Sequence, residues 1–170
     1  MECCKLLPGP QGLAAASQTS ARPRYFAPAS ASPTLPIMTS IDKIAWLHLH
    51  DGRLLSTRSY GKDRYYIPGG KREAGETDAQ TLLREIREEL SVTLDAATLR
   101  YAGTFEAQAH GHPTGLLVRM TCYYAPYRGT LQPAAEIEQL VWLTYRHRPE
   151  VSPVDQLIFD WLRAQGLLTE

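Results

Sequence analysis

Residues 70–92 read GKREAGETDAQTLLREIREELSV, and this stretch decides both the fold and the chemistry of the chain. Thr77 and Gln80 match a capping box, which predicts that a helix begins at about Asp78. The apolar residues of the stretch recur at helical spacing and form one face, which consists of Ala79, Leu82, Leu83, Ile86 and Leu90. The stretch therefore predicts an amphipathic helix that packs on a core.

Three glutamates lie beside the apolar face of this helix. Because each residue advances a helix by about 100°, Glu85, Glu88 and Glu89 fall within roughly one third of its circumference. Glu85 and Glu89 are like charges four residues apart, so they repel each other unless a cation lies between them. Carboxylate oxygens suit Mg²⁺, which often binds substrate phosphates as well. Gly69 and Gly70 allow tight backbone geometry just before the helix, where a carbonyl can add another oxygen ligand.

The pentapeptide EIREE alone is typical of a solvated, charged helix face. The longer spacing argues against that interpretation, because Gly70, Glu76, residues 84–89 and Val92 form a joint pattern. A chance match to this pattern in a chain of this length is on the order of 10⁻⁶ at average residue frequencies.

This pattern resembles the signature of the Nudix hydrolase family, Gly-x5-Glu-x7-Arg-Glu-U-x-Glu-Glu-x-Gly-U, in which U is aliphatic. The matching residues are Gly70, Glu76, Arg84, Glu85, Ile86, Glu88, Glu89 and Val92. Ser91 stands where the family has glycine, and a left-handed serine there costs about 1–2 kcal/mol. The order of elements from Ile41 to Leu168 also agrees with the family. The resemblance implies an α+β fold, the Nudix-type α/β/α sandwich with a mixed β-sheet, in a MutT-like protein.

The resemblance also implies an activity, namely hydrolysis of a nucleoside diphosphate linked to another moiety. The implied cofactor is Mg²⁺, with Mn²⁺ as a substitute. The catalytic candidates are Glu85, Glu88, Glu89 and Arg84, and the candidate metal ligands are Gly69, Gly70, Glu85, Glu88, Glu89 and Glu136. Either Glu88 or Glu89 can take the proton of the attacking water, and this choice stays open. Glu76 and Arg84 resemble the supporting ion pair of the family, the alternative being an ordinary surface salt bridge.

The candidates for substrate binding are Arg58, Tyr65, Tyr66, Gly70 and Lys71. Arg58 stands at a strand end, like a basic residue that reaches phosphate in similar proteins, and a solvated arginine is the alternative. One of the two tyrosines can stack on a base, although strand alternation by itself would bury one of them.

Four further residues carry alternatives. Glu136 precedes a strand, in a region where family members often bring another carboxylate to the metal, and Glu106 competes for that role. His110 and His112 flank Gly111 at an expected hairpin loop, and we interpret them as a solvated turn rather than a metal pair.

The substrate itself stays open among a free or oxidised nucleoside triphosphate, a nucleotide sugar, ADP-ribose and a dinucleotide. The alternative function is a non-catalytic Nudix-fold module that senses a nucleotide, which the complete glutamate set disfavours. The expected partner is a small nucleotide, and a homodimer is open because many members of the family are dimers.

The rest of the chain predicts a sheet and a second helix. A hairpin with its turn at Asp51–Gly52 is expected between residues 44 and 58, followed by strands over 99–109, 116–124 and 137–145. A last helix is expected from about Ser152, with Pro153 in its first turn, and Gly166 ends it. Cys122 lies in an apolar run and is expected in the core.

Composition sets the class of protein. The chain has 170 residues, with 18 basic and 18 acidic side chains and no long uncharged apolar run, which argues against a membrane span and against a nucleic-acid polymer as partner. Residues 1–37 hold six of the twelve prolines and are expected to be a disordered leader before a domain at 38–170. We expect a cytoplasmic protein, the alternative being a leader that targets an organelle.

Overall fold

The computed structural model describes residues 40–170, so the expected leader lies outside the described residues. The strands are β1 (Ser40–Trp46), β2 (Leu49–His50), β3 (Arg53–Ser59), β4 (Gly69–Lys71), β5 (Thr93–Leu94), β6 (Arg100–Gln108), β7 (Leu117–Tyr124), β8 (Tyr127–Arg128) and β9 (Ile137–Leu143). The helices are α1 (Asp78–Leu90) and α2 (Pro153–Ala164), with the 3₁₀ helices η1 (Ala96–Thr98) and η2 (Tyr145–Glu150).

The larger sheet is mixed and has the strand order β4-β1-β7-β6, in which β1 and β7 run parallel. A smaller antiparallel sheet has the order β2-β3-β9. The chain passes from one sheet to the other directly after β1, where the Leu47 N–H donates to the Tyr123 carbonyl at 2.8 Å and the His48 carbonyl accepts from the Leu55 N–H at 2.9 Å.

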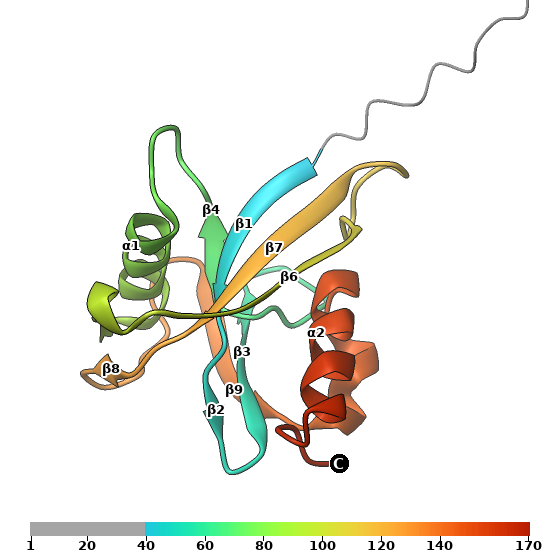
Figure 1. Cartoon of the computed structure of the whole chain (residues 1–170). Coiled ribbons are helices and arrows are strands. Elements are labelled where there is room, and N and C mark those ends of the chain that lie inside the picture. The colour runs from blue at the N-terminus through green and yellow to red at the C-terminus, as the bar shows by residue number, and fades with distance from the viewer. Residues whose placement is uncertain (1–39) are drawn as a thin grey trace, which may run out of the picture. The chain divides into compact units, whose positions relative to one another are not determined.

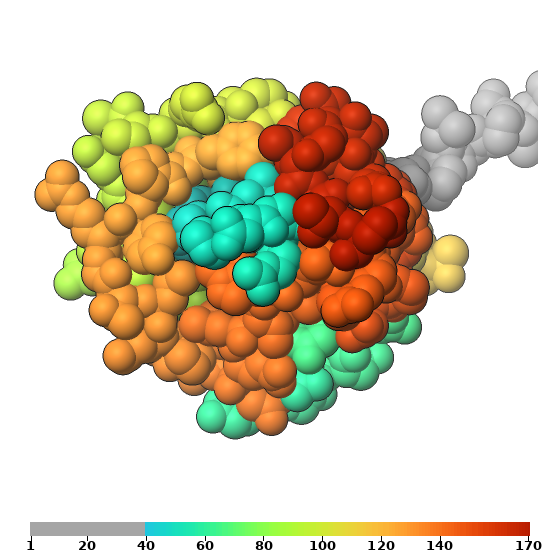
Figure 2. All heavy atoms as spheres, turned by 90° about the horizontal axis from the view of Figure 1, so that it is seen from below, coloured from blue at the N-terminus to red at the C-terminus, as the bar shows by residue number. Residues whose placement is uncertain are grey.

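The expected hairpin joins β2 and β3. Asp51 and Gly52 have positive φ angles of 49° and 69°, which suit a two-residue hairpin turn. Gly52 also accepts from the Thr169 N–H at 2.8 Å, so the tip of the hairpin lies against the C-terminal residues, as the space-filling view shows (Figure 2).

The two helices lie on opposite sides of the strands (Figure 1). One cluster of buried side chains joins α1 to the strands through Leu82, Ile86 and Leu90, and a second joins α2 through Ile158 and Phe159. Cys122 is fully buried in the second cluster, as expected. This arrangement confirms the α+β sandwich, and no helix within residues 40–170 is long and apolar enough to cross a bilayer.

The helix predicted from residues 70–92 begins and ends where its sequence indicates. The Gln80 N–H donates to the Thr77 hydroxyl at 3.3 Å, and the Thr77 N–H donates to the Gln80 side chain at 2.9 Å, which completes the capping box. At the other end Ser91 adopts φ 60° and ψ 20°, the left-handed conformation in which glycine is favoured. The departure from the family pattern therefore leaves the turn geometry unchanged.

Replacement of Ser91 by glycine is expected to raise the free energy of unfolding by about 1 kcal/mol. The relief of left-handed strain, about 1–2 kcal/mol, is partly offset by the larger entropy of glycine in the unfolded chain. Urea unfolding of the two proteins measures the difference, with Ser91→Ala as the control that keeps a Cβ. A stability equal to or below that of the parent protein contradicts the strain at this position.

Candidate active site

Two of the three glutamates of α1 line a cleft of about 400 Å³. Helix α1 buries Leu82, Ile86 and Leu90 completely, and this anchoring places Glu85 and Glu89 at the edge of the buried face. The side chain of Glu85 is 16% exposed, and Glu89 is 8% exposed as a residue. The two carboxylates are therefore held at a protein wall instead of in bulk water.

The wall facing them is the short strand β4, where the sequence predicted only tight backbone geometry at Gly69 and Gly70. Gly69 has φ 135°, and a Cβ there would overlap the Ile44 carbonyl of β1. A Cβ on Gly70 would overlap the carboxylate of Glu85. A side chain fits at neither position, because Gly69 lies too close to strand β1 and Gly70 lies too close to the carboxylate of Glu85.

Glu89 occupies an environment that disfavours its charge. Burial raises the pKa of Glu89 to about 7, and repulsion from Glu85 and Glu136 acts in the same direction. The Gly69 N–H donates to Glu89 at 3.2 Å and, with the charge of Lys43, holds the pKa lower than burial alone would. The cleft therefore concentrates negative charge that a cation would compensate.

Arg84 is held in place by Glu76 beside this wall. Its Nε and Nη2 donate to the two carboxylate oxygens of Glu76 at 2.8 and 2.9 Å, and its Nη1 donates to Glu85 at 2.9 Å. Glu76 also accepts from the Thr81 hydroxyl at 2.8 Å and the Glu73 N–H at 3.0 Å. These bonds lower the pKa of Glu76 to about 2, and the bond from Arg84 contributes most. They also connect the loop before α1 to the helix.

The cleft brings together seven of the residues that the sequence analysis named as catalytic, metal-binding or substrate-binding candidates. These are Tyr66, Gly69, Gly70, Lys71, Glu85, Glu89 and Glu136. They come from the loop after β3, from β4, from α1 and from the segment before β9. Between residues 40 and 170, however, no three His, Cys, Asp or Glu side chains already converge as a metal cluster.

Four other candidates lie outside the lining of the cleft. Arg84 is bound to Glu76 as described, and the side chain of Glu88 is 57% exposed, 3.7 Å from Arg84. Arg58 donates to Gln139 at 2.8 Å and lies over the ring of Tyr65, whose centroid is 5.4 Å from its guanidinium carbon. Arg58 also pairs with Glu138 at 3.3 Å. The β3–β9 register places Arg58 opposite Gln139, whose side chain also donates to the Tyr65 hydroxyl at 3.4 Å.

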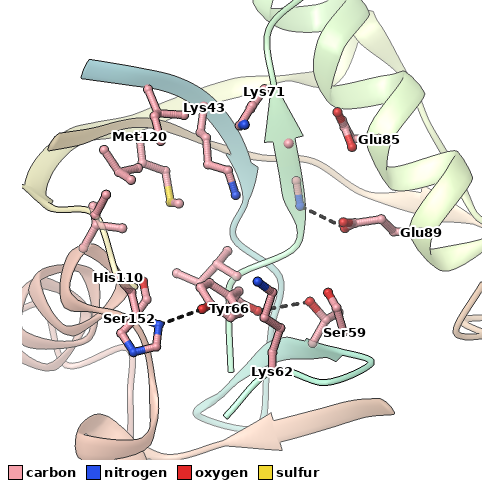
Figure 3. Close-up of a pocket in the computed structure, with 18 of the residues that line it drawn as sticks. Lys43, Ser59, Lys62, Tyr66, Lys71, Glu85, Glu89, His110, Met120 and Ser152 are labelled. Atoms are coloured by element: carbon pink, nitrogen blue, oxygen red, sulfur yellow. Dashed lines mark hydrogen bonds between the residues drawn. The ribbon is translucent and has the colours of Figure 1, made fainter. Parts of the chain in front are cut away.

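The sequence reasoning missed several residues of the cleft, among them Lys43, Lys62, Met120 and Ser152. His110 and His112, which we interpreted as a solvated turn, also line the cleft, and the Nδ1 of His110 lies 3.0 Å from the Tyr66 hydroxyl (Figure 3). No local pattern signals these residues, because they come from distant parts of the sequence, namely from β1 and β7, from the segments after β3 and β6, and from the residue before α2.

One further missed residue is a fully buried carboxylate beside the cleft. Asp155, in the first turn of α2, accepts from the Ser152 hydroxyl at 2.7 Å through one oxygen, while its other oxygen has no hydrogen-bond partner within the described residues. Burial raises the pKa of Asp155 to about 7, and the Ser152 hydrogen bond and the charge of Lys43 act in the opposite direction.

The chain is similar in sequence to several known proteins. The family model described as NUDIX domain matches residues 42–162. The CTP pyrophosphohydrolase of Escherichia coli strain K12 is 34% identical over 110 residues, which cover 62% of this chain and 76% of that protein. The NAD-capped RNA hydrolase NudC of Vibrio atlanticus is 32% identical over 91 residues, or 53% of this chain, but the match spans only 31% of its length.

Solved structures agree with the family match. The solution structure of the E. coli ORF135 protein has 28% identity and a TM-score of 0.58, over 77% of this chain and 96% of that one. The MutT NUDIX hydrolase of Burkholderia pseudomallei, at 19% identity, shares the fold with a TM-score of 0.60 over 72% of this chain and 97% of that one. The chain therefore belongs to the Nudix family and is a hydrolase that acts on phosphoric anhydride bonds.

Proposed function

We propose that the protein is a Mg²⁺-dependent pyrophosphohydrolase that cleaves a nucleoside diphosphate linked to another moiety, with a nucleoside triphosphate as the leading substrate. The observation that carries the proposal is that Glu85 and Glu89 line one cleft against the glycine strand β4. The similarity to a CTP pyrophosphohydrolase over 76% of that protein supports a nucleotide of this kind.

The donor atoms of the cleft fit a hard divalent cation. Glu85, Glu89 and Glu136 supply carboxylate oxygens. Burial and repulsion from the other two glutamates disfavour the charged form of Glu89, and a bound cation would stabilise it. The absence of a Cβ at Gly70 keeps the space in front of Glu85 open. We propose these three glutamates, Glu88 and a carbonyl of the Gly69–Gly70 pair as the ligands.

The bound metal would neutralise charge on phosphoryl oxygens and lower the pKa of a water molecule. The residues of the chain orient the site, accept the proton and contact the nucleotide. Arg84 and Glu76 hold α1 against the loop, so that Glu85 keeps its orientation toward β4. Glu88 or Glu89 takes the proton of the attacking water, and of these two Glu89 lines the cleft. The proposed contacts for the nucleotide are Arg58, Tyr65, Tyr66, Gly70 and Lys71.

A product assay tests the proposal. The purified protein is incubated with nucleoside triphosphates, nucleotide sugars, ADP-ribose and dinucleotides, with Mg²⁺, with Mn²⁺ and with neither. We expect metal-dependent release of a nucleoside monophosphate from at least one compound, and chromatography of the products identifies the cleaved bond. Absence of turnover across this panel, in a protein that melts cooperatively, contradicts the proposal.

Replacement of Gly70 by alanine is expected to lower kcat/KM by about 10- to 100-fold. The added methyl group overlaps the Glu85 carboxylate, so that the carboxylate must leave its position facing β4. Steady-state kinetics measures the loss. Ala74→Ser serves as the control in the same loop, because it adds one heavy atom to an exposed side chain whose backbone is not left-handed. Full activity of the Gly70 variant contradicts a role for this orientation of Glu85.

A further inference from the structure

The lysines of the described chain are confined to the cleft. Residues 40–170 contain three lysines, Lys43, Lys62 and Lys71, and all three line it. None of them lies within 4.0 Å of a carboxylate in this part of the chain, whereas arginines such as Arg72 and Arg84 form ion pairs. A flexible ammonium group without a partner is a common binder of phosphate.

Two of these lysines lie directly opposite each other. Lys43 of β1 pairs in register with Lys71 of β4, so both side chains project from the same face of the sheet. Like charges at directly opposed positions destabilise a sheet. The fold thus places two cations side by side without a protein anion between them, and an anionic ligand would relieve their repulsion.

The third lysine faces them across the cleft. Figure 3 shows Lys43 reaching from β1 toward the centre of the cleft, Lys62 pointing toward the same region from the opposite side, and Glu85 and Glu89 on the wall formed by α1. The cleft therefore has an acidic wall, where the proposed metal ligands lie, and a separate group of ammonium groups on the strands and the loop.

Lys43 is the least expected member of this group. It is half-buried on the central strand β1, next to Met120 of β7 in the strand register. Its charge lowers the pKa of Glu89 in the acidic wall and of Asp155 beside the cleft, so it lies between α1 and the first turn of α2. A half-buried lysine in a sheet loses hydration that a phosphate oxygen can replace.

We propose that Lys43 binds a phosphate group of the substrate and, opposite Lys71, makes the cleft prefer a chain of three phosphates over a diphosphate that ends in an uncharged group. This inference rests on the proposed function, since it names the substrate class of the same cleft. A terminal phosphate monoester carries about two negative charges near neutral pH, which the paired ammonium groups match. A nucleotide sugar offers a neutral group at that place.

The first arm of the test needs no turnover. Calorimetry measures binding of inorganic tripolyphosphate and of pyrophosphate without divalent metal, at low ionic strength. We expect Lys43→Met to weaken tripolyphosphate binding about 10- to 100-fold, and Lys43→Arg to retain most of it. The matched control is Arg119→Met, which removes one cation from the exposed face of the neighbouring strand β7. An effect of Lys43 that acts only through metal binding at Glu89 would be absent from this arm.

The second arm compares substrates. With Mg²⁺, Lys43→Met is expected to raise the KM for a nucleoside triphosphate about tenfold or more with a small change in kcat, and to change kcat/KM for a nucleotide sugar less than about threefold. Equal losses on both substrates, or tripolyphosphate binding that matches the Arg119 variant, overturn the inference. Lys43-dependent binding of tripolyphosphate in a protein that hydrolyses none of the panel overturns the proposed function and leaves the anion site in place.

Discussion

Replacement of Glu89 by glutamine is expected to lower metal-dependent kcat/KM by about 10²- to 10³-fold or more. The substitution keeps the size of the side chain, and its amide oxygen can still accept from the Gly69 N–H. It removes the one carboxylate of the cleft that combines burial, repulsion from two other glutamates and direct contact with β4. Release of phosphate or pyrophosphate from the best substrate, measured over a range of Mg²⁺ concentrations, gives the size of the loss.

The controls separate chemistry from folding. Glu170→Gln makes the same chemical change at the exposed C-terminal residue, outside the cleft, and is expected to keep activity within about twofold. Because burial disfavours the charge of Glu89, the glutamine variant should melt at or above the temperature of the parent protein at pH 8. Activity within about fivefold of the parent, in a protein that melts normally, refutes the assignment of Glu89 to the metal site.

Helix α1 could be predicted from the sequence because its signals are local. The capping box at Thr77 and Gln80 marks its start, and the apolar spacing marks the face that becomes buried. The hairpin at Asp51–Gly52 is local in the same sense. Strands β5 and β8, with two residues each, are too short to show any alternation, and their pairing joins segments more than thirty residues apart.

Helical geometry predicts the positions of the three glutamates only in part. Relative to Glu85, Glu89 lies about 40° to one side and Glu88 about 60° to the other. The sequence places all three beside the apolar stripe, but it does not say on which side of the helix the wall stands. In the structure β4 stands on the side of Glu89, so that Glu89 is buried and Glu88 faces solvent.

The ammonium groups of the cleft depend on long-range pairing. Lys43 and Lys71 become neighbours only because β1 and β4 pair antiparallel, and Met120 joins them because β1 and β7 pair parallel. A parallel pair needs a long crossover connection, and the sequence carries no local signal of its register. For this reason the acidic wall could be predicted from one helix, whereas the opposite wall required the assembled sheet.

The stability of the protein is expected to depend on pH through Asp155. Its pKa is raised to about 7 in the folded state, well above that of an unfolded aspartate. Between about pH 4 and pH 7 the folded state keeps the proton that the unfolded state loses, so the free energy of unfolding falls by about 1.4 kcal/mol per pH unit. Above pH 7 both states are ionised, and this contribution becomes constant at its lowest value.

Asp155→Asn removes this titration, so the difference in unfolding free energy between the two proteins isolates it from all other groups. Relative to the asparagine variant, the parent protein is expected to lose about 2–4 kcal/mol between pH 4 and pH 8, with most of the loss complete by pH 7. Ser152→Ala should extend the loss to higher pH, because the Ser152 hydroxyl donates to Asp155 and stabilises its ionised form. A difference that stays flat over this range contradicts a buried, protonated Asp155 near neutral pH.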